Sequence, residues 1–120
     1  MNAIPMINVF SKPCYSQFDD QDWEILAHHW YPVARIQDVN EKPQQVTLLD
    51  VKLAIYKTES GVIHLVRDIC PHRGVPLSKG WVSGENIVCP YHGLQYNEQG
   101  KCIKIPAQPE LTKISDRFSL

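Results

Sequence analysis

The sequence of 120 residues predicts an all-β fold, a small antiparallel barrel or sandwich. Short apolar or alternating runs recur from Tyr31 onward, and residues that favour turns bound each run. Three such turns are 59–61, 83–86 and 97–100, where glycine can adopt a positive φ. A chain of this length forms one domain, and it hides roughly two-thirds of its unfolded surface when it folds.

One short helix is expected ahead of the strands, over residues 22–29. Asp19 or Asp20 could cap its first turn, where acidic residues suit the helix dipole, and the helix must end before Pro32. This helix belongs to an N-terminal arm of residues 1–29. The β-rich domain is then expected to cover residues 30–120.

The strands are expected where β-branched, aromatic and alternating residues cluster between turns. In chain order these runs are 32–36, 45–49, 51–57, 62–67, 86–89, 94–96 and 101–105.

The overall charge argues against two classes of partner. Twelve Lys and Arg against thirteen Asp and Glu leave a net charge of −1, so no basic surplus exists to neutralise the backbone of a nucleic acid. The apolar runs are far shorter than the roughly 20 residues that cross a bilayer, and the N-terminus lacks the pattern of a secretory signal. We therefore expect no nucleic acid, no membrane and a cytoplasmic location.

Four cysteines indicate metal chemistry rather than disulfides in such a reducing location. Two of them lie close to histidines, in the pattern C-x-H, sixteen residues, then C-x-x-H. Each half follows an expected strand and sits in a loop stiffened by proline, with a glycine for the tight turn. A hairpin between the halves would bring the loops together. The candidate ligands are Cys70, His72, Cys89 and His92.

Two cofactors fit two thiolates and two imidazoles. Zinc binds all four on one ion, and its ligands usually come as like pairs with longer spacing. A Rieske-type [2Fe–2S] cluster binds two thiolates on one iron and two imidazoles on the other. Because each loop here pairs unlike ligands, the spacing favours the cluster and leaves zinc as the alternative. Cys14 and Cys102, which have no histidine nearby, are read as plain thiols.

The segments RDICPHRGVPLSKG and IVCPYHG closely resemble the Rieske domain of ring-hydroxylating oxygenase large subunits. The resemblance extends from about Trp30 to Ala107. It implies a Rieske-type β-sandwich or barrel, in which two hairpin loops hold a [2Fe–2S] cluster through Cys70, His72, Cys89 and His92.

The resemblance also implies a function as the N-terminal electron-transfer domain of an aromatic-ring-hydroxylating or demethylating oxygenase. Such a domain relays electrons from a reductase or ferredoxin to a mononuclear iron in the catalytic domain of a neighbouring subunit, and the full-length enzyme would be a homo-oligomer, a trimer. Five histidines leave no plausible oxygen-activating site beside the cluster, and the segments 111–114 and 118–120 leave little room to close the sheet. We therefore expect a further domain beyond this chain.

Two other functions stay open: a stand-alone Rieske ferredoxin and a zinc-binding structural module. Within the resemblance, high-potential relatives carry an extra disulfide and a serine hydroxyl near the cluster. The matching positions here hold Val75, Tyr91 and Leu94, which can supply neither group, although Tyr96 could donate one hydrogen bond. The sequence therefore predicts a low-potential cluster.

Five further residues receive ordinary structural roles. Arg73 is expected to form a loop salt bridge, with Asp68 as one candidate partner, and Trp81 to pack beneath the ligand loops. His64 is expected to be a packed strand residue. The adjacent His28 and His29 would diverge on a helix and are not ligands.

Overall fold

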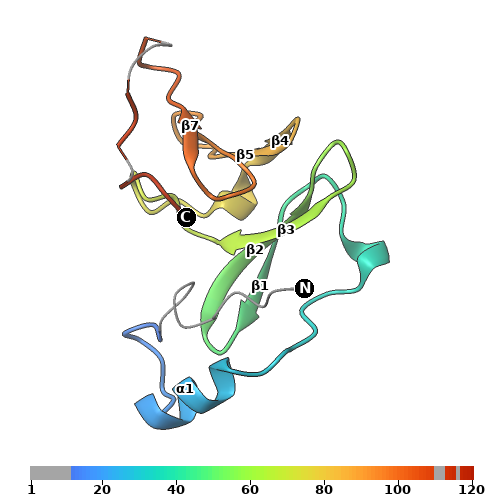
Figure 1. Ribbon diagram of the computed structural model, residues 1–120, viewed down its shortest axis with the longest axis vertical. Helices are drawn as coiled ribbons and strands as arrows, with labels where there is room; N and C mark the ends of the chain where they lie inside the picture. The colour runs from blue at the N-terminus through green and yellow to red at the C-terminus, as the bar shows by residue number, and fades with distance from the viewer. Residues whose placement is uncertain (1–11, 110–112, 116) are drawn as a thin grey trace.

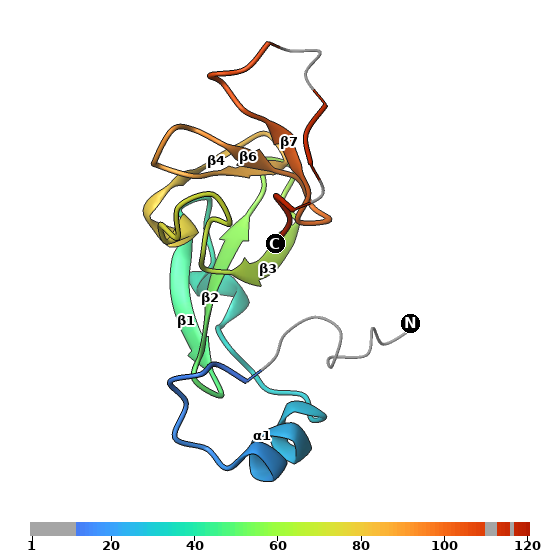
Figure 2. The same ribbon diagram turned by 90° about the vertical axis from the view of Figure 1, so that its left-hand side faces the viewer.

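The computed structural model describes residues 12–109, 113–115 and 117–120, which form a short helix and two antiparallel sheets (Figure 1). The molecule measures 45 × 32 × 28 Å along its principal axes. Figure 2 shows the helix at one end, the first sheet in the middle and the second sheet at the other end. The predicted all-β class is confirmed.

The first sheet has three strands in the order β1-β2-β3 and the second has four in the order β4-β5-β6-β7, with every neighbouring pair antiparallel. Antiparallel neighbours need only short connections, and consecutive strands are neighbours throughout. The strands are β1 (Gln44–Leu48), β2 (Val51–Lys57), β3 (Ile63–Arg67), β4 (Trp81–Ser83), β5 (Asn86–Val88), β6 (Gln95–Tyr96) and β7 (Cys102–Lys104).

The helix α1 (Asp20–Ala27) packs against the first sheet. The carboxylate of Asp19 accepts a hydrogen bond from the Gln21 backbone amide, which makes Asp19 the N-cap. Trp23 is buried on β2 beside Leu53, and its indole N–H donates to the Leu49 carbonyl at 2.8 Å. The helix therefore begins and ends two residues earlier than expected, because Asp19 caps it.

The segment 32–36 is not a strand, so that expectation is wrong. Pro32 has no N–H to offer a neighbouring strand, and the described chain passes through irregular structure into the 3₁₀ turn η2 (Ile36–Asp38). Strand β4 was missed because its three residues are too few to show an alternating pattern. It forms through its hairpin with β5, in which Trp81 pairs with Val88.

Of the two C-terminal runs, the structure describes only one in full. Residues 111–112 of the run 111–114 lie outside the described residues. The run 118–120 contributes one isolated antiparallel bridge, between Ser119 and Lys101. Among the residues that the structure describes, the helix is too short and too polar to span a membrane.

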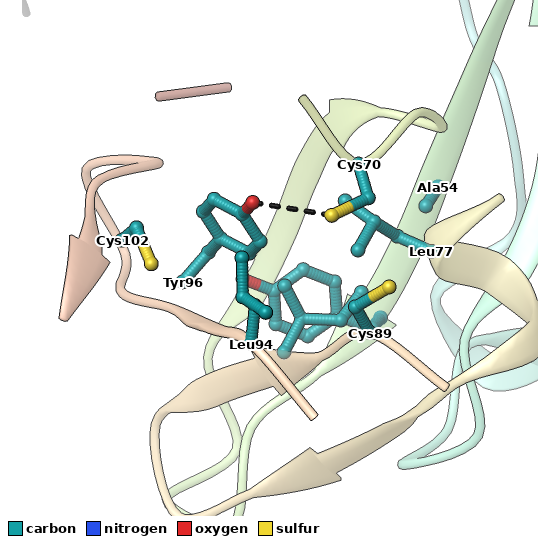
Figure 3. Packing of buried hydrophobic residues seen from close by; sticks show 9 residues of the cluster. Ala54, Cys70, Leu77, Cys89, Leu94, Tyr96 and Cys102 are labelled. Atoms are coloured by element: carbon teal, nitrogen blue, oxygen red, sulfur yellow. Dashed lines mark hydrogen bonds between the residues drawn. The ribbon is translucent and has the colours of Figure 1, made fainter. Parts of the chain in front are cut away.

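The main core lies where the two sheets meet. It is built from buried residues of β2, β5, β6 and β7 together with residues of the intervening loops (Figure 3). Its members are Ala54, Tyr56, Cys70, Leu77, Ile87, Cys89, Leu94, Tyr96 and Cys102. Two of the candidate ligands therefore belong to the main core.

Candidate metal centre

Two loops of the same backbone design carry the candidate ligands. In the first loop the Cys70 amide donates to the Val75 carbonyl at 2.9 Å, and in the second the Cys89 amide donates to the Leu94 carbonyl at 2.8 Å. The fifth residue of each loop is a glycine with positive φ, 75° at Gly74 and 73° at Gly93. The expected role of these glycines in tight turns is confirmed.

The histidine occupies a different position in each loop. His72 is the third residue of its loop, whereas His92 is the fourth and has a φ of 69°, which is uncommon for a residue with a side chain. The second loop therefore has two consecutive left-handed residues, His92 and Gly93. Despite the offset, the two imidazole rings lie 5.5 Å apart between centroids.

The two candidate ligand thiols point into the protein. Cys70 and Cys89 are each 1% exposed, and both contribute to the main core (Figure 3). Burial raises the pKa of the Cys89 thiol to about 11, against the opposite effect of a hydrogen bond with the Tyr91 backbone. A metal bound here has to displace the thiol proton.

The two imidazoles lie nearer to solvent. His92 is exposed, and its ring stacks on that of Tyr91 with 3.9 Å between centroids. His72 is half-buried, and its Nδ1 is buried without a hydrogen-bond partner in the described part of the chain. An unpartnered buried ring nitrogen is costly unless it binds something, and a metal ion would satisfy it.

The division between inner thiols and outer imidazoles suits a two-iron cluster. The thiols of Cys70 and Cys89 interact with each other, and the rings of His72 and His92 lie 5.5 Å apart between centroids. A [2Fe–2S] cluster needs two such ligand pairs, one of thiolates and one of imidazoles. The residues therefore fit the cluster.

Tyr96 lies directly beside the inner ligands. Its hydroxyl is 3.2 Å from the Cys70 sulfur, the contact drawn as a dashed line in Figure 3. Burial, and then the hydrogen bond with Cys70, raise the pKa of Tyr96. The phenol therefore stays protonated and can donate to a Cys70 thiolate, as the sequence suggested.

Asp68 stabilises the backbone around the first ligand loop. Its carboxylate accepts hydrogen bonds from the backbone amide and hydroxyl of Ser78 and from the Gln45 amide nitrogen, each at 2.6 Å. These three donors occupy Asp68, and Arg73 is exposed, so the expected pairing of Arg73 with Asp68 is wrong.

Other residues near the motifs occupy less prominent places. Trp81 is 52% exposed on strand β4, so the expectation that it packs beneath the ligand loops is wrong, and the fully buried Leu77 lies in the core with the ligand thiols. Position 80, three residues after Leu77, must be glycine, because a Cβ there would lie 1.9 Å from the Val88 carbonyl oxygen. His64 packs 5.7 Å from the Tyr56 ring, as expected.

The remaining cysteines and histidines lie outside the two loops. Cys14 is exposed, and Cys102 is buried in the main core. His28 and His29 are exposed at the end of the helix.

The family model for the Rieske [2Fe-2S] domain matches residues 29–115. The chain belongs to this family. The dicamba O-demethylase oxygenase component of Stenotrophomonas maltophilia is 43% identical over 82 residues, which cover 68% of this chain and 24% of that protein. The methylxanthine N1-demethylase NdmA of Pseudomonas putida is 38% identical over 92 residues, which cover 72% of this chain and 26% of that protein.

Solved structures agree with these sequence relatives. A structure of NdmA from Pseudomonas putida CBB5 superposes with a TM-score of 0.73 at 35% identity, over 80% of this chain and 30% of that one. A crystal structure of dicamba monooxygenase gives 0.70 at 36% identity, over 76% and 28%. The chain thus spans about a quarter of the length of the relatives it matches. As a Rieske domain it carries a [2Fe–2S] cluster and transfers electrons, and these relatives lend no support to a zinc module or a stand-alone ferredoxin.

Proposed function

We propose that Cys70 and Cys89 bind one iron of the cluster and that His72 and His92 bind the other. The observation that carries this assignment is the burial of the four side chains. The thiols lie inside the main core, whereas His72 is half-buried and His92 is exposed, with their rings 5.5 Å apart. The ligand-bearing domain is residues 30–120, preceded by the arm 1–29.

This ligand arrangement indicates on which side the electron leaves the cluster. The bound cluster accepts and returns one electron, and two neutral imidazoles make it easier to reduce than a cluster with four thiolates. The core holds the thiol side rigidly, and Tyr96 offers Cys70 a hydrogen bond that stabilises extra negative charge. The imidazole edges of His72 and His92 form the exit for the electron, because they are the ligands nearest to solvent.

We further propose that the chain works as the N-terminal electron-transfer domain of an oxygenase. Its relatives include a vanillate O-demethylase oxygenase subunit and a phenoxybenzoate dioxygenase subunit alpha. The domain would take electrons from a reductase or ferredoxin and deliver them to a mononuclear iron in a neighbouring subunit of a cytoplasmic homotrimer. The reaction would be the oxygenation or demethylation of a substituted aromatic acid.

The ligand assignment is tested on protein purified anaerobically. We expect about two irons and two acid-labile sulfides per chain, a red-brown colour, and the low-g EPR signal of a Rieske cluster after reduction. The variants C70S and C89S should lose iron and colour, and H72A and H92A should lose the EPR signal. H64A is the matched control, since His64 is also half-buried with an unpartnered ring nitrogen among the described residues, but its ring packs on Tyr56 rather than on a candidate ligand. An intact signal in H72A or H92A contradicts the assignment.

A further inference from the structure

The last four residues of the chain return to the cluster-binding region. We call residues 117–120 the C-terminal strap. In Figures 1 and 2 the end of the chain lies beside the loop that follows β3, which is the first ligand loop.

Backbone contacts fix the strap on the turn before β7. The Phe118 carbonyl accepts from the Cys102 amide at 3.0 Å, and the Leu120 amide donates to the Gly100 carbonyl at 2.6 Å. Ser119 forms an antiparallel bridge with Lys101 between these two hydrogen bonds. The side chains of Phe118 and Leu120 pack against the main core, so the strap is held on two sides.

This attachment brings one aromatic ring against one candidate ligand. The centroid of the Phe118 ring is 6.0 Å from that of His72, with 53° between the ring planes. His72 Nδ1 is buried and has no hydrogen-bond partner among the described residues. Packing against Phe118 therefore contributes to the orientation of the His72 ring and leaves Nδ1 available to a metal.

We propose that Phe118 is a positioning residue for the cluster, which holds the His72 ring in its ligating orientation and keeps water away from it. This inference rests on the proposed role of His72 as an iron ligand. Water near a ligand stabilises the more negative, reduced state of a cluster, so an apolar ring at this place keeps the reduction potential low. It also restricts the access of chelators to the imidazole side.

The test compares variants of the cluster-loaded protein. F118A should shift the midpoint potential to a more positive value, broaden or shift the low-g EPR signal, and lose iron to a chelator several-fold faster than the parent protein. F118Y keeps an aromatic ring, so its midpoint potential, EPR signal and rate of iron loss should match those of the parent protein. I114A is the control. Ile114 also packs against the main core from the C-terminal region, but the ring that contacts His72 belongs to Phe118. I114A should lower the melting temperature without moving the potential or the signal.

The possible results separate this inference from the proposed function. An unchanged potential, signal and chelation rate in F118A overturns the role of Phe118, as does an equal change in I114A, which would indicate a general loosening of the core. If F118A cannot take up the cluster while I114A can, the dependence on the ring supports the proposal, and equal failure contradicts it. A parent protein without the cluster spectrum, or H72A with the EPR signal intact, overturns the ligand assignment and this inference with it.

Discussion

Two tyrosines in the main core differ in the partners of their hydroxyl groups. Tyr56 and Tyr96 are both fully buried. The Tyr96 hydroxyl contacts the Cys70 sulfur, whereas the Tyr56 hydroxyl has no hydrogen-bond partner within the described residues. A buried hydroxyl that donates to a cluster ligand stabilises the more negative, reduced state of the cluster. A buried hydroxyl without a partner lowers the stability of the fold. The two phenols therefore allow redox tuning and stability to be tested separately.

At Tyr96 we expect the substitution Y96F to lower the midpoint potential. Loss of the hydrogen bond to Cys70 removes stabilisation from the electron-rich reduced cluster. A hydrogen bond to a charged group contributes about 1.5–3 kcal/mol, only part of which differs between redox states, so the shift is on the order of tens of millivolts. A redox titration followed by EPR measures it, with Y56F as the control. A potential that is unchanged or higher would show that Tyr96 does not donate to Cys70.

At Tyr56 we expect the substitution Y56F to raise the free energy of unfolding by roughly 1 kcal/mol, because it removes a buried hydroxyl that has no partner. Chemical denaturation at neutral pH measures this change. A loss of more than about 1 kcal/mol would mean that the hydroxyl has a partner after all.

The same tyrosine predicts a pH dependence. Burial, assisted by the carboxylates of Glu85 and Glu98, raises the pKa of Tyr56 from 10.0 to about 12. Because the folded state holds this proton more tightly than the unfolded state, the stabilising contribution is complete below pH 10.0 and is lost as the pH rises towards about 12. Unfolding measured across this window should show a smaller decline for Y56F than for the parent protein. Equal declines would contradict the assignment.

The element that shapes the first ligand loop is the turn η3 (Leu77–Lys79), and Asp68 anchors it. We expect D68A to reduce the free energy of unfolding by about 3 kcal/mol, because two donors of Ser78 lose their charged acceptor in a buried place. D68N keeps the shape and one acceptor oxygen, so it should lose less. Thermal unfolding and iron content measure both effects. Equal losses for D68A and D68N would show that the carboxylate charge, rather than its shape, holds the turn.

The elements that could be predicted from sequence are those fixed by local chemistry. Asp19 can cap a helix, and glycine at the fifth position of each ligand loop permits the left-handed turn that closes it. Strand β4 could not be predicted, because its three residues are too few to show an alternating pattern. The apolar run 32–36 was misleading, because Pro32 cannot donate a hydrogen bond to a neighbouring strand.

The candidate site was predictable in its composition but not in its geometry. The spacing of cysteine and histidine indicates the ligand set. However, the left-handed backbone at His92 could not be predicted, because histidine adopts this conformation more often than most residues but still uncommonly. The partner of Asp68 and the exposed position of Trp81 likewise depend on contacts between elements.

At the scale of the whole molecule, the N-terminal arm and the first sheet share a second core. Trp23 and Ala27 of the helix cover Val51 and Leu53 of β2, and all four are buried. The face of β2 that points away from the main core therefore depends on the arm.

Removal of residues 1–29 should accordingly destabilise the domain. The loss of Trp23 alone corresponds to about 3–5 kcal/mol, the usual cost of truncating a buried tryptophan to alanine. W23A tests this contribution without shortening the chain, and I25A is its control because Ile25 is 55% exposed on the same helix. Denaturation of both variants measures the difference, and equal stabilities would show that the arm does not support the fold.

With Cys70 and Cys89 as the proposed iron ligands, the survival of the chain in a cell would depend on iron supply. Both thiols pack beside Leu77 and Leu94, so metal binding there would stabilise the interior as well as the site. A chain made during iron starvation keeps an interior without that added stability, and its two loops open more often. Proteases cleave such openings first, so unfilled chains would be cleared while filled ones persist.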